Sequence, residues 1–581
     1  MNYLRHRGRV AAVIACSAAL TACTLLLNSS VEEQCSTDAD CVARGPAFAG
    51  SVCTPQRVCT SPSARTDGGD TDAPDQGGCT SNKDCIERNG NQPYTCRKAD
   101  KRCVSLLSTT CDRIYAQKAD LESDEAVYVG FMSVGRTGNT ASVGLQEEAG
   151  AELAQREIAR GTAGLPPSSP GRPRRPLVVI SCDELADSAG SVSYLVDELR
   201  VPAILGPALS NNFIAATATT IAKDVLLMST TASSPLIAGL DKKGLVYSVN
   251  PSDALAADAW VKYLAEIEPR LKDPTNGVTG GGPLKVMVIQ RGDGLGIGMV
   301  NVINSKVRFN GMTAAQNDQA GHFRVFNYGD PFDKVNNPNP EQKYNEAAIA
   351  IRDFKPHFVI GAGTSEIPEH ILTKLEQDLW NEPDYRPFYI GVRGLETPAL
   401  MALMQGSEDD AGSKRTFRNR IITTGFGTVG STVFANFQLR YKAEFTDPST
   451  IPPGQYAAQA YDSVYLIAYA IAGAGEEPLT GSRISAGLLK TQPAQPPVPK
   501  IDVGPDSVSN AFIDLSNGKQ LDVNGASGPL DIDQASGVVT TDVQLRCLVV
   551  DGTGKPTGWK DSGRYLSTAT DELTGTMNCP Q

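Results

Sequence analysis

Two series of short apolar segments, each alternating with amphipathic segments, run through the chain from about residue 126. In the first series we predict strands at Val127–Met132, Leu177–Ser181, Val201–Leu205 and Val225–Ser229, and helices at Leu145–Arg160, Ala189–Leu199 and Asn211–Ala222. A second series of strands begins at Lys285–Gln290 and continues with Phe358–Gly361, Phe388–Ile390 and Ile421–Thr424. Short apolar strands that alternate with helices are typical of right-handed βαβ units in a parallel sheet. The pattern therefore predicts an α/β protein with two doubly wound lobes.

The N-terminus has the organisation of an export signal. Arg5, Arg7 and Arg9 precede the apolar run Val10–Leu20. This run is shorter than the roughly 20 residues that a membrane-spanning helix needs, and it has the size of a signal-peptide core. Leu20-Thr21-Ala22-Cys23 resembles the lipobox of bacterial lipoproteins, in which the cysteine is lipidated and the chain is cut before it. We expect a signal peptide over 1–22, a lipid on Cys23 and a tether over 23–34; an ordinary secretory signal is the alternative.

By the same resemblance, Thr24 after Cys23 favours the outer membrane, because an aspartate there commonly retains lipoproteins in the inner membrane. The sequence contains no other stretch as long as a transmembrane helix, so the lipid would be the only anchor in the cell envelope. The formal net charge of −12 gives a surface that attracts neither nucleic acid nor anionic lipid.

The cysteine content agrees with export. Of 14 cysteines, Cys16 leaves with the signal and Cys23 takes the lipid, so an even number remains, as expected for disulfides in an oxidising compartment. Eight of them form two similar modules within residues 35–111: Cys35, Cys41, Cys53 and Cys59, then Cys79, Cys85, Cys96 and Cys103. Zinc is the competing interpretation, but neither module contains a Cys-x-x-Cys pair or a histidine. We therefore expect two disulfides in each module and no metal.

The last four cysteines are expected to pair as Cys547 with Cys579, because both lie in the C-terminal segment, and as Cys111 with Cys182. The two modules are separated by an acidic linker at 61–78. Its aspartates lack the closing glutamate of a calcium loop, and Pro74 would break the turn. A flexible linker is the better interpretation.

Sequence motifs of enzymes are not evident. The run from Gly292 to Gly298 lacks the Gly-x-Gly-x-x-Gly spacing of a dinucleotide loop and lies in the second series of strands. The sequence contains no Gly-x-Ser-x-Gly elbow, P-loop or His-Glu-x-x-His helix. We therefore expect neither catalysis nor a cofactor.

Several segments carry a family resemblance. Val201-Pro202-Ala203-Ile204-Leu205-Gly206-Pro207 and Val225-Leu226-Leu227-Met228-Ser229-Thr230-Thr231 are followed by Tyr247-Ser248-Val249-Asn250-Pro251. Further along the chain come Asp293-Gly294-Leu295-Gly296 and Ala460-Tyr461-Asp462-Ser463-Val464-Tyr465. Together, over about residues 126–551, they resemble the type 1 periplasmic binding proteins, in particular the leucine/isoleucine/valine receptors of ABC importers.

The resemblance implies a two-lobed domain over 126–581, joined by a hinge that the chain crosses three times. Lobe I would hold about 126–252 and 428–489, and lobe II about 253–427 and 490–581. It also implies a function: capture of a small ligand between the lobes and delivery to an ABC permease. A ligand-sensing or adhesive surface lipoprotein with the same fold is the alternative, favoured by the cysteine-rich modules.

In doubly wound sheets, ligands bind beyond the carboxyl ends of the strands, where loops and helix N-termini present free N–H groups. Ser210, and the loop formed by Thr231, Ala232 and Ser233, follow two such strands and suit a ligand carboxylate. The alternative for Ser210 is a simple N-cap.

By resemblance, Leu295 and Thr364 stand where relatives place aromatic side chains over the ligand. Arg393 stands where relatives place an acid against the ligand ammonium. An arginine there would repel an ammonium, so an anionic or neutral ligand is expected rather than an ordinary amino acid. If the alignment has slipped, Arg393 is a solvated loop residue.

Overall fold

The computed structural model describes residues 37, 52–53, 59–60 and 78–579, the last range with gaps at 138–139, 274–281, 380–385, 408–416, 428–430, 448–450, 476–477 and 494–496. The chain divides into two compact units, 1–78 and 79–581. In the first unit, β1 (Val52–Cys53) pairs antiparallel with β2 (Cys59–Thr60). The predictions for the signal 1–22, the tether with Cys23, Cys35 and Cys41, and nearly all of the linker lie outside the described residues.

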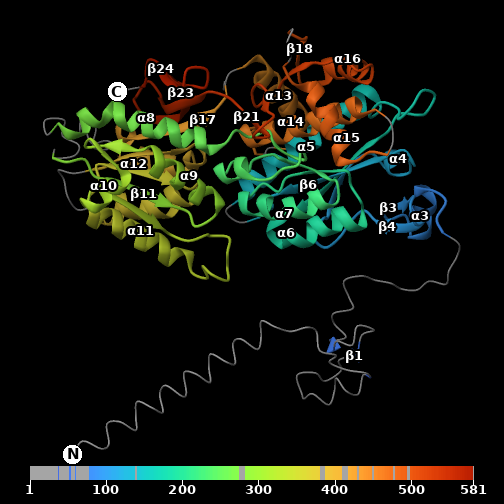
Figure 1. The fold of residues 1–581 in the computed structure, drawn as a ribbon, viewed down its shortest axis with the longest axis horizontal. Helices are drawn as coiled ribbons and strands as arrows, with labels where there is room; N and C mark the ends of the chain where they lie inside the picture. Colours follow the sequence, from blue (N-terminus) through green and yellow to red (C-terminus); the bar gives the residue numbers. More distant parts are fainter. Residues whose placement is uncertain are drawn as a thin grey trace, which may run out of the picture. The chain divides into compact units, whose positions relative to one another are not determined.

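The second unit contains two eight-stranded sheets (Figure 1). The order in the first sheet is β20-β21-β10-β9-β8-β6-β7-β5. Its strands are β5 (Arg113–Tyr115), β6 (Val127–Ser133), β7 (Leu177–Asp183), β8 (Ala203–Leu205), β9 (Leu226–Ser229), β10 (Val246–Ser248), β20 (Ile532–Asp533) and β21 (Val538–Val539). Pairing is parallel from β7 across to β21, whereas β5 and β20 pair antiparallel at the two edges.

Helices cover both faces of this first sheet, because alternate strand residues point to opposite sides. Leu177 and Val179 of β7 belong to the core beneath α5 (Ala141–Thr162), α14 (Gln455–Ala474) and α16 (Pro505–Ser516). Val178 and Ile180 belong to the core beneath α6 (Glu184–Ser193), η4 (Tyr194–Glu198) and α7 (Ser210–Ala222). The orange helix α14 lies beside the cyan α5 although the two are far apart in sequence, and α15 (Gly481–Leu488) packs against α14 (Figure 1).

The order in the second sheet is β14-β11-β15-β16-β17-β22-β23-β24. Its strands are β11 (Val286–Gln290), β14 (Phe323–Asn327), β15 (Phe358–Ala362), β16 (Phe388–Val392), β17 (Ile421–Phe426), β22 (Val543–Val550), β23 (Pro556–Ser567) and β24 (Glu572–Gly575). The first five are parallel, and the C-terminal three extend the sheet antiparallel.

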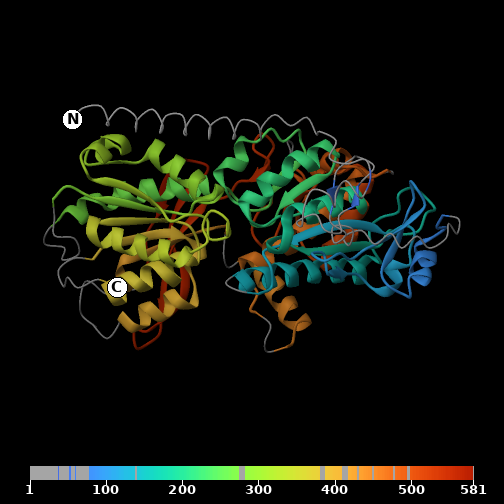
Figure 2. The same ribbon diagram turned by 90° about the horizontal axis from the view of Figure 1, so that it is seen from below.

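Helices also lie on both sides of this second sheet (Figure 2). The helical segments of its lobe are α8 (Asp253–Lys272), α9 (Gly294–Lys306), α10 (Ala314–Gln319), α11 (Pro340–Phe354), η7 (Ile367–Leu372), η8 (Lys374–Leu379), η9 (Arg393–Leu395), α12 (Pro398–Ser407) and η11 (Phe417–Arg420). Smaller elements complete the unit: α4 (Lys118–Leu121), η5 (Pro235–Gly239), α13 (Thr432–Glu444), η12 (Leu489–Thr491), and the pairs β12 (Arg308–Phe309) with β13 (Met312–Thr313) and β18 (Lys500–Asp502) with β19 (Asp522–Asn524).

The parallel parts of both sheets share one topology. In the first, the strands stand in the order β7-β6-β8-β9-β10, and in the second in the order β14-β11-β15-β16-β17. Each is the doubly wound order 2-1-3-4-5, whose topological switch point lies between the first and third strands. The predicted strands all occur, with ends within two residues of those expected, so the predicted fold class is confirmed.

The chain crosses between the lobes three times: after β10, after β17 and between β21 and β22. The expected number is right, but the third crossing was placed wrongly, at about residue 490. It lies between Val539 and Val543, because α16 packs on α5 and α14, and β20 and β21 join the first sheet. The described residues of 490–540, which leave out 494–496, therefore belong to lobe I.

The start of lobe I also needs correction from 126. β5 pairs with β7 as an edge strand, so residues 113–115 are part of the first sheet. The second cysteine module, with α3 (Asn82–Arg88), β3 (Tyr94–Arg97) and β4 (Arg102–Ser105), lies in the same compact unit as both lobes. Asn82 connects them, because its amide donates to Ser123 O at 2.7 Å and to Tyr128 Oη at 2.9 Å.

Four disulfides occur among the described residues. Cys79 pairs with Cys96 and Cys85 with Cys103, both inside the second module. Cys111–Cys182 and Cys547–Cys579 are the two pairs expected from the sequence. Among the helices of the described ranges, none combines the length and the apolarity that crossing a membrane requires.

Candidate functional site

The loops of lobe I that were expected to hold a ligand carboxylate already contain carboxylates of the chain. Glu184, the first residue of α6, accepts hydrogen bonds from the backbone N–H groups of Ala208 and Leu209, each at 3.0 Å. These are the free donors just before α7. Burial, together with the charge of Glu147, raises the pKa of Glu184 to about 8. Glu184 thus binds the two backbone N–H groups that directly precede α7.

Ser210 lies beside this position but is not the N-cap, which is Leu209. Its buried hydroxyl accepts the backbone N–H of Ser234 at 3.3 Å. This contact fastens two loops of lobe I to each other, and the expected role of Ser210 at a ligand stays a prediction.

In the second loop, at residues 230–233, hydroxyl groups likewise bind carboxylates of the chain. The hydroxyls of Thr230 and Thr231 donate to Oε1 of Glu147, a residue of α5, at 3.0 and 2.9 Å. Glu147 is fully buried, and burial raises its pKa to about 7. The hydroxyl of Ser233 donates to Asp253 at 2.5 Å, and burial raises the pKa of that carboxyl also to about 7. Ala232 is buried in the core beneath α6 and α7.

Leu295 and Thr364, the residues expected at the switch point of the second sheet, have different environments. Leu295 is 5% exposed and belongs to the core of lobe II, so its side chain is a packing residue. Thr364 is partly exposed; its hydroxyl accepts from Arg291 at 2.8 Å and donates to Glu366 at 2.7 Å. Burial alone would raise the pKa of Glu366, but Arg291 and the hydrogen-bond donors around it lower that pKa below its ordinary value.

Arg393 follows β16 and reaches across the lobes. Its guanidinium donates from Nη1 to Gln455 Oε1 of α14 in lobe I at 3.3 Å, and its Nε lies 3.8 Å from Glu396. Glu396 itself is held more closely by Arg546, at 2.7 Å. Burial, and the neighbouring charge of Arg546, lower the pKa of Arg393. The side chain keeps 27% of its surface exposed, so a ligand can reach it.

The start of α14 contacts both α5, the helix that carries Glu147, and Arg393 of lobe II. Gly454 N–H donates to Gln146 of α5 at 2.9 Å, next to Glu147 in the sequence. The half-buried Tyr456 follows Gln455, the partner of Arg393. Burial raises the pKa of Tyr456 to about 12, whereas the positive charge of Arg393 lowers it and Glu147 raises it. Sequence reasoning missed both Glu147 and Tyr456, because neither belongs to a strand-end loop.

The lobes touch directly through the glycine run of α9. Gly294 N–H donates to Asn211 Oδ1 at 2.7 Å, and the hydroxyl of Ser234 donates to Gly294 O at 2.6 Å. A Cβ on Gly298 would lie 2.8 Å from Cδ of Pro235. The run that does not fit a dinucleotide loop is therefore a contact surface between the lobes.

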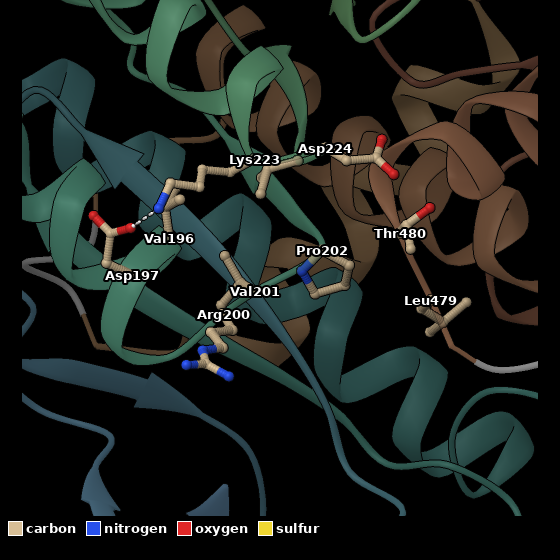
Figure 3. Close-up of a pocket in the computed structure, with 10 residues that line it drawn as sticks. Val196, Asp197, Arg200, Val201, Pro202, Lys223, Asp224, Leu479 and Thr480 are labelled. Atoms are coloured by element: carbon tan, nitrogen blue, oxygen red, sulfur yellow. Dashed lines mark hydrogen bonds and ion pairs between the residues drawn. The ribbon is translucent and has the colours of Figure 1, made fainter. Parts of the chain in front are cut away.

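A separate pocket of about 420 Å³ lies in lobe I (Figure 3). Pro202 and Val225 in its lining precede β8 and β9, so it opens at the amino ends of these strands, opposite the loops described above. Three of its charged groups have partners within the protein: Lys223 contacts Asp197 at 2.7 Å, and Asp224 accepts from Ser482. None of the site residues expected from the sequence lines it.

One group of potential metal ligands stands out in the described ranges. The sulfur atoms of Cys79, Cys85 and Cys96 lie within 4.8 Å of one another. All three are in disulfides, and metal binding needs thiolates. The chemistry of these sulfurs agrees with a structural role.

No protein-family model and no curated protein sequence matches the chain. Solved structures that are similar in fold are substrate-binding proteins of transporters. The branched-chain amino acid transporter substrate-binding protein of Streptococcus pneumoniae, in complex with isoleucine, has 18% identity and a TM-score of 0.49 and covers 78% of this chain and 100% of its own. A leucine-binding protein of Thermotoga maritima has 16% identity and a TM-score of 0.49, covering 75% and 99%. A solute-binding protein from R. palustris in complex with benzoate has 14% identity and a TM-score of 0.47, covering 78% and 100%.

Proposed function

We propose that this chain is an extracytoplasmic solute-binding lipoprotein that captures a small ligand between its lobes, as the receptor of an ABC importer of amino-acid or related solutes. The observation that carries the proposal is the position of Arg393. It follows a strand of lobe II, contacts Gln455 of lobe I and remains partly exposed. A ligand that binds there touches both lobes, so its binding favours their closed arrangement.

The chemistry of Arg393 favours an anionic group on the ligand. Within the described part of the chain, its contacts are one hydrogen bond to Gln455 and the long approach to Glu396. A guanidinium has five N–H donors and can hold a carboxylate through two parallel hydrogen bonds. Donors therefore remain for a ligand.

The experiment is a thermal-shift screen of the mature full-length protein against amino acids, organic acids and short peptides, followed by calorimetric titration of each hit. Arg393→Ala should weaken the binding of a hit by about 2–5 kcal/mol, as for truncation of one partner of a buried charged pair. Arg352→Ala is the matched control, because Arg352 is a surface residue of lobe II that pairs with Asp353. If no compound of the screen binds, or if both variants bind as the wild type does, the proposal fails.

The lipid anchor rests on the segment Leu20-Thr21-Ala22-Cys23. Cys23→Ser should release the protein from membranes or block its processing. Unchanged membrane fractionation together with a normal mature mass would contradict the anchor.

A ligand-sensing or adhesive surface lipoprotein is the second candidate. It is favoured by the second cysteine module, which packs on lobe I through Asn82 and forms part of the same compact unit. Co-purification of a permease, or a permease gene next to this one, would favour the importer. Ligand binding by this protein, with neither a co-purifying permease nor a neighbouring permease gene, would favour the sensor.

A further inference from the structure

Two hydrogen bonds join the lobes through carboxyl groups of lobe II. The hydroxyl of Ser233 in lobe I donates to Oδ2 of Asp253 at 2.5 Å. The side-chain amide of Asn211, also in lobe I, donates to Oδ2 of Asp330 at 3.2 Å. Asp253 is the first residue of α8, which follows the first crossing of the chain, and Asp330 lies in the loop after β14. Because each donor belongs to one lobe and each acceptor to the other, separation of the lobes breaks both bonds and returns the carboxyl groups to water.

The carboxyl group of Asp253 is buried without a counter-charge of its own. Asp253 is 4% exposed, and among the described residues it has no ion-pair partner. Arg291 faces both Asp253 and Asp330. Its guanidinium, however, is bound to Asp293 at 2.8 Å and approaches Glu366 at 3.5 Å. One cation thus serves four carboxyl groups, and a carboxylate buried in this way is costly. Closed lobes therefore favour the protonated form of Asp253.

The charged and titratable groups around Asp253 come from several elements. Arg291, at the end of β11, and the hydroxyl of Ser233 lower its pKa, whereas Asp293, directly before α9, raises it. Tyr456 of α14 also faces Asp253, and burial raises the pKa of this tyrosine to about 12, so it is neutral at physiological pH. The largest influence is burial, and the resulting pKa of Asp253 is about 7.

Separated lobes favour the ionised form of Asp253. The residue lies in the first turn of α8, where the positive end of the helix dipole stabilises an anion. In water its carboxyl group has the ordinary pKa of 3.8. Between pH 3.8 and about 7, the closed arrangement consequently holds a proton that the open arrangement releases.

We propose that closure of the lobes is coupled to the uptake of a proton by Asp253, so that acidic pH favours the closed arrangement and rising pH favours the open one. This inference rests on the proposed function, because it concerns the closure that holds the ligand. The ratio of closed to open lobes should fall by up to tenfold for each pH unit between 3.8 and about 7. Asp330 acts in the same direction: burial raises its pKa, as do the charges of Asp293 and Asp333, whereas Arg291 lowers it.

The first test is small-angle scattering of the mature full-length protein without ligand, from about pH 4.5 to about pH 8, a range that includes the transition. The radius of gyration of the wild type should increase as the pH rises. Asp253→Asn keeps an oxygen that accepts from Ser233 but cannot ionise, so most of this increase should be lost. Glu184→Gln is the matched control, because this buried carboxyl group binds Ala208, Leu209 and Asn212, all within lobe I. It should keep the pH dependence of the wild type, and circular dichroism should show both variants folded.

The second test is calorimetric titration at about pH 6, in buffers that differ in ionisation enthalpy, with each amino acid or organic acid that the thermal-shift screen identifies. Binding should take up about one proton in the wild type and in Glu184→Gln, and clearly less in Asp253→Asn. A constant radius of gyration in the wild type, or the same pH dependence in Asp253→Asn, overturns the coupling whether or not a ligand binds. If the radius of gyration changes as expected and no compound binds, the solute-binding function fails while the coupling stands.

Discussion

The closed arrangement of the lobes should depend on the absence of a side chain at Gly298. In α9, a Cβ at this position would lie 2.8 Å from Cδ of Pro235 and 3.0 Å from Oγ of Ser234, both in lobe I. Non-bonded carbon atoms are most stable at roughly 3.5–4.0 Å. The change Gly298→Ala therefore requires the lobes to separate here by roughly 1 Å.

The magnitude follows from the contacts that this separation affects. Overpacking costs about 1–3 kcal/mol. The hydrogen bond from Ser234 to Gly294 would be weakened as well, at about 1 kcal/mol. Alanine also stabilises α9 by about 1 kcal/mol relative to glycine, but it does so whether the lobes are closed or open. The equilibrium between closed and open lobes should thus shift toward open by about 2–4 kcal/mol.

Small-angle scattering of the ligand-free protein should show a larger radius of gyration for Gly298→Ala than for the wild type. Ligand affinity should fall, because only the closed fraction binds with full strength. Gly406→Ala is the control: this helical glycine has open space where its Cβ would lie, so both observables should stay at the wild-type values. If Gly298→Ala scatters and binds as the wild type does, α9 does not set the closure of the lobes.

Three further outcomes are expected. Replacing Cys547 and Cys579 by serine should lower the free energy of unfolding by about 4 kcal/mol, because the disulfide closes a loop of 32 residues; denaturant titration with an unchanged midpoint would contradict this. Asn82→Ala should lower the free energy of unfolding by about 1–3 kcal/mol, because it leaves buried partners without their hydrogen bonds. It should also expose the second cysteine module to limited proteolysis. An unchanged cleavage rate would show that other contacts hold the module. Burial, together with the charge of Glu147, raises the pKa of Glu184 from 4.5 to about 8 in the folded state. Between these two pH values the folded state binds more protons than the unfolded state, so the free energy of unfolding falls as the pH rises from 4.5 to about 8. Glu184→Gln, which cannot ionise, should gain stability relative to the wild type by up to roughly 1.4 kcal/mol per pH unit between those values, and equal thermal midpoints at pH 5 and 8 would refute it.

The amino-acid sequence by itself determined the two lobes. Strands such as Leu177–Asp183 are buried on both faces and are therefore continuous apolar runs, which are visible without any partner. The pairing of Cys547 with Cys579 was also predictable, because the C-terminal segment offers no other cysteine. The very short strands β20 and β21 carry too little pattern to show which sheet they join, so the third crossing was placed wrongly.

Only the tertiary structure decided the character of the site. A hydroxyl in a strand-end loop can serve a ligand or a neighbouring residue, and local sequence does not distinguish these uses. The partner of Thr231 is Glu147, 84 residues earlier in the chain, and the carboxylate before α7 comes from Glu184 of another helix. Which carboxylate reaches which donor depends on how α5 and α6 pack against the sheet. For that reason the sequence indicated where a ligand would bind, whereas the packing of distant helices determined which charge each lobe presents to it.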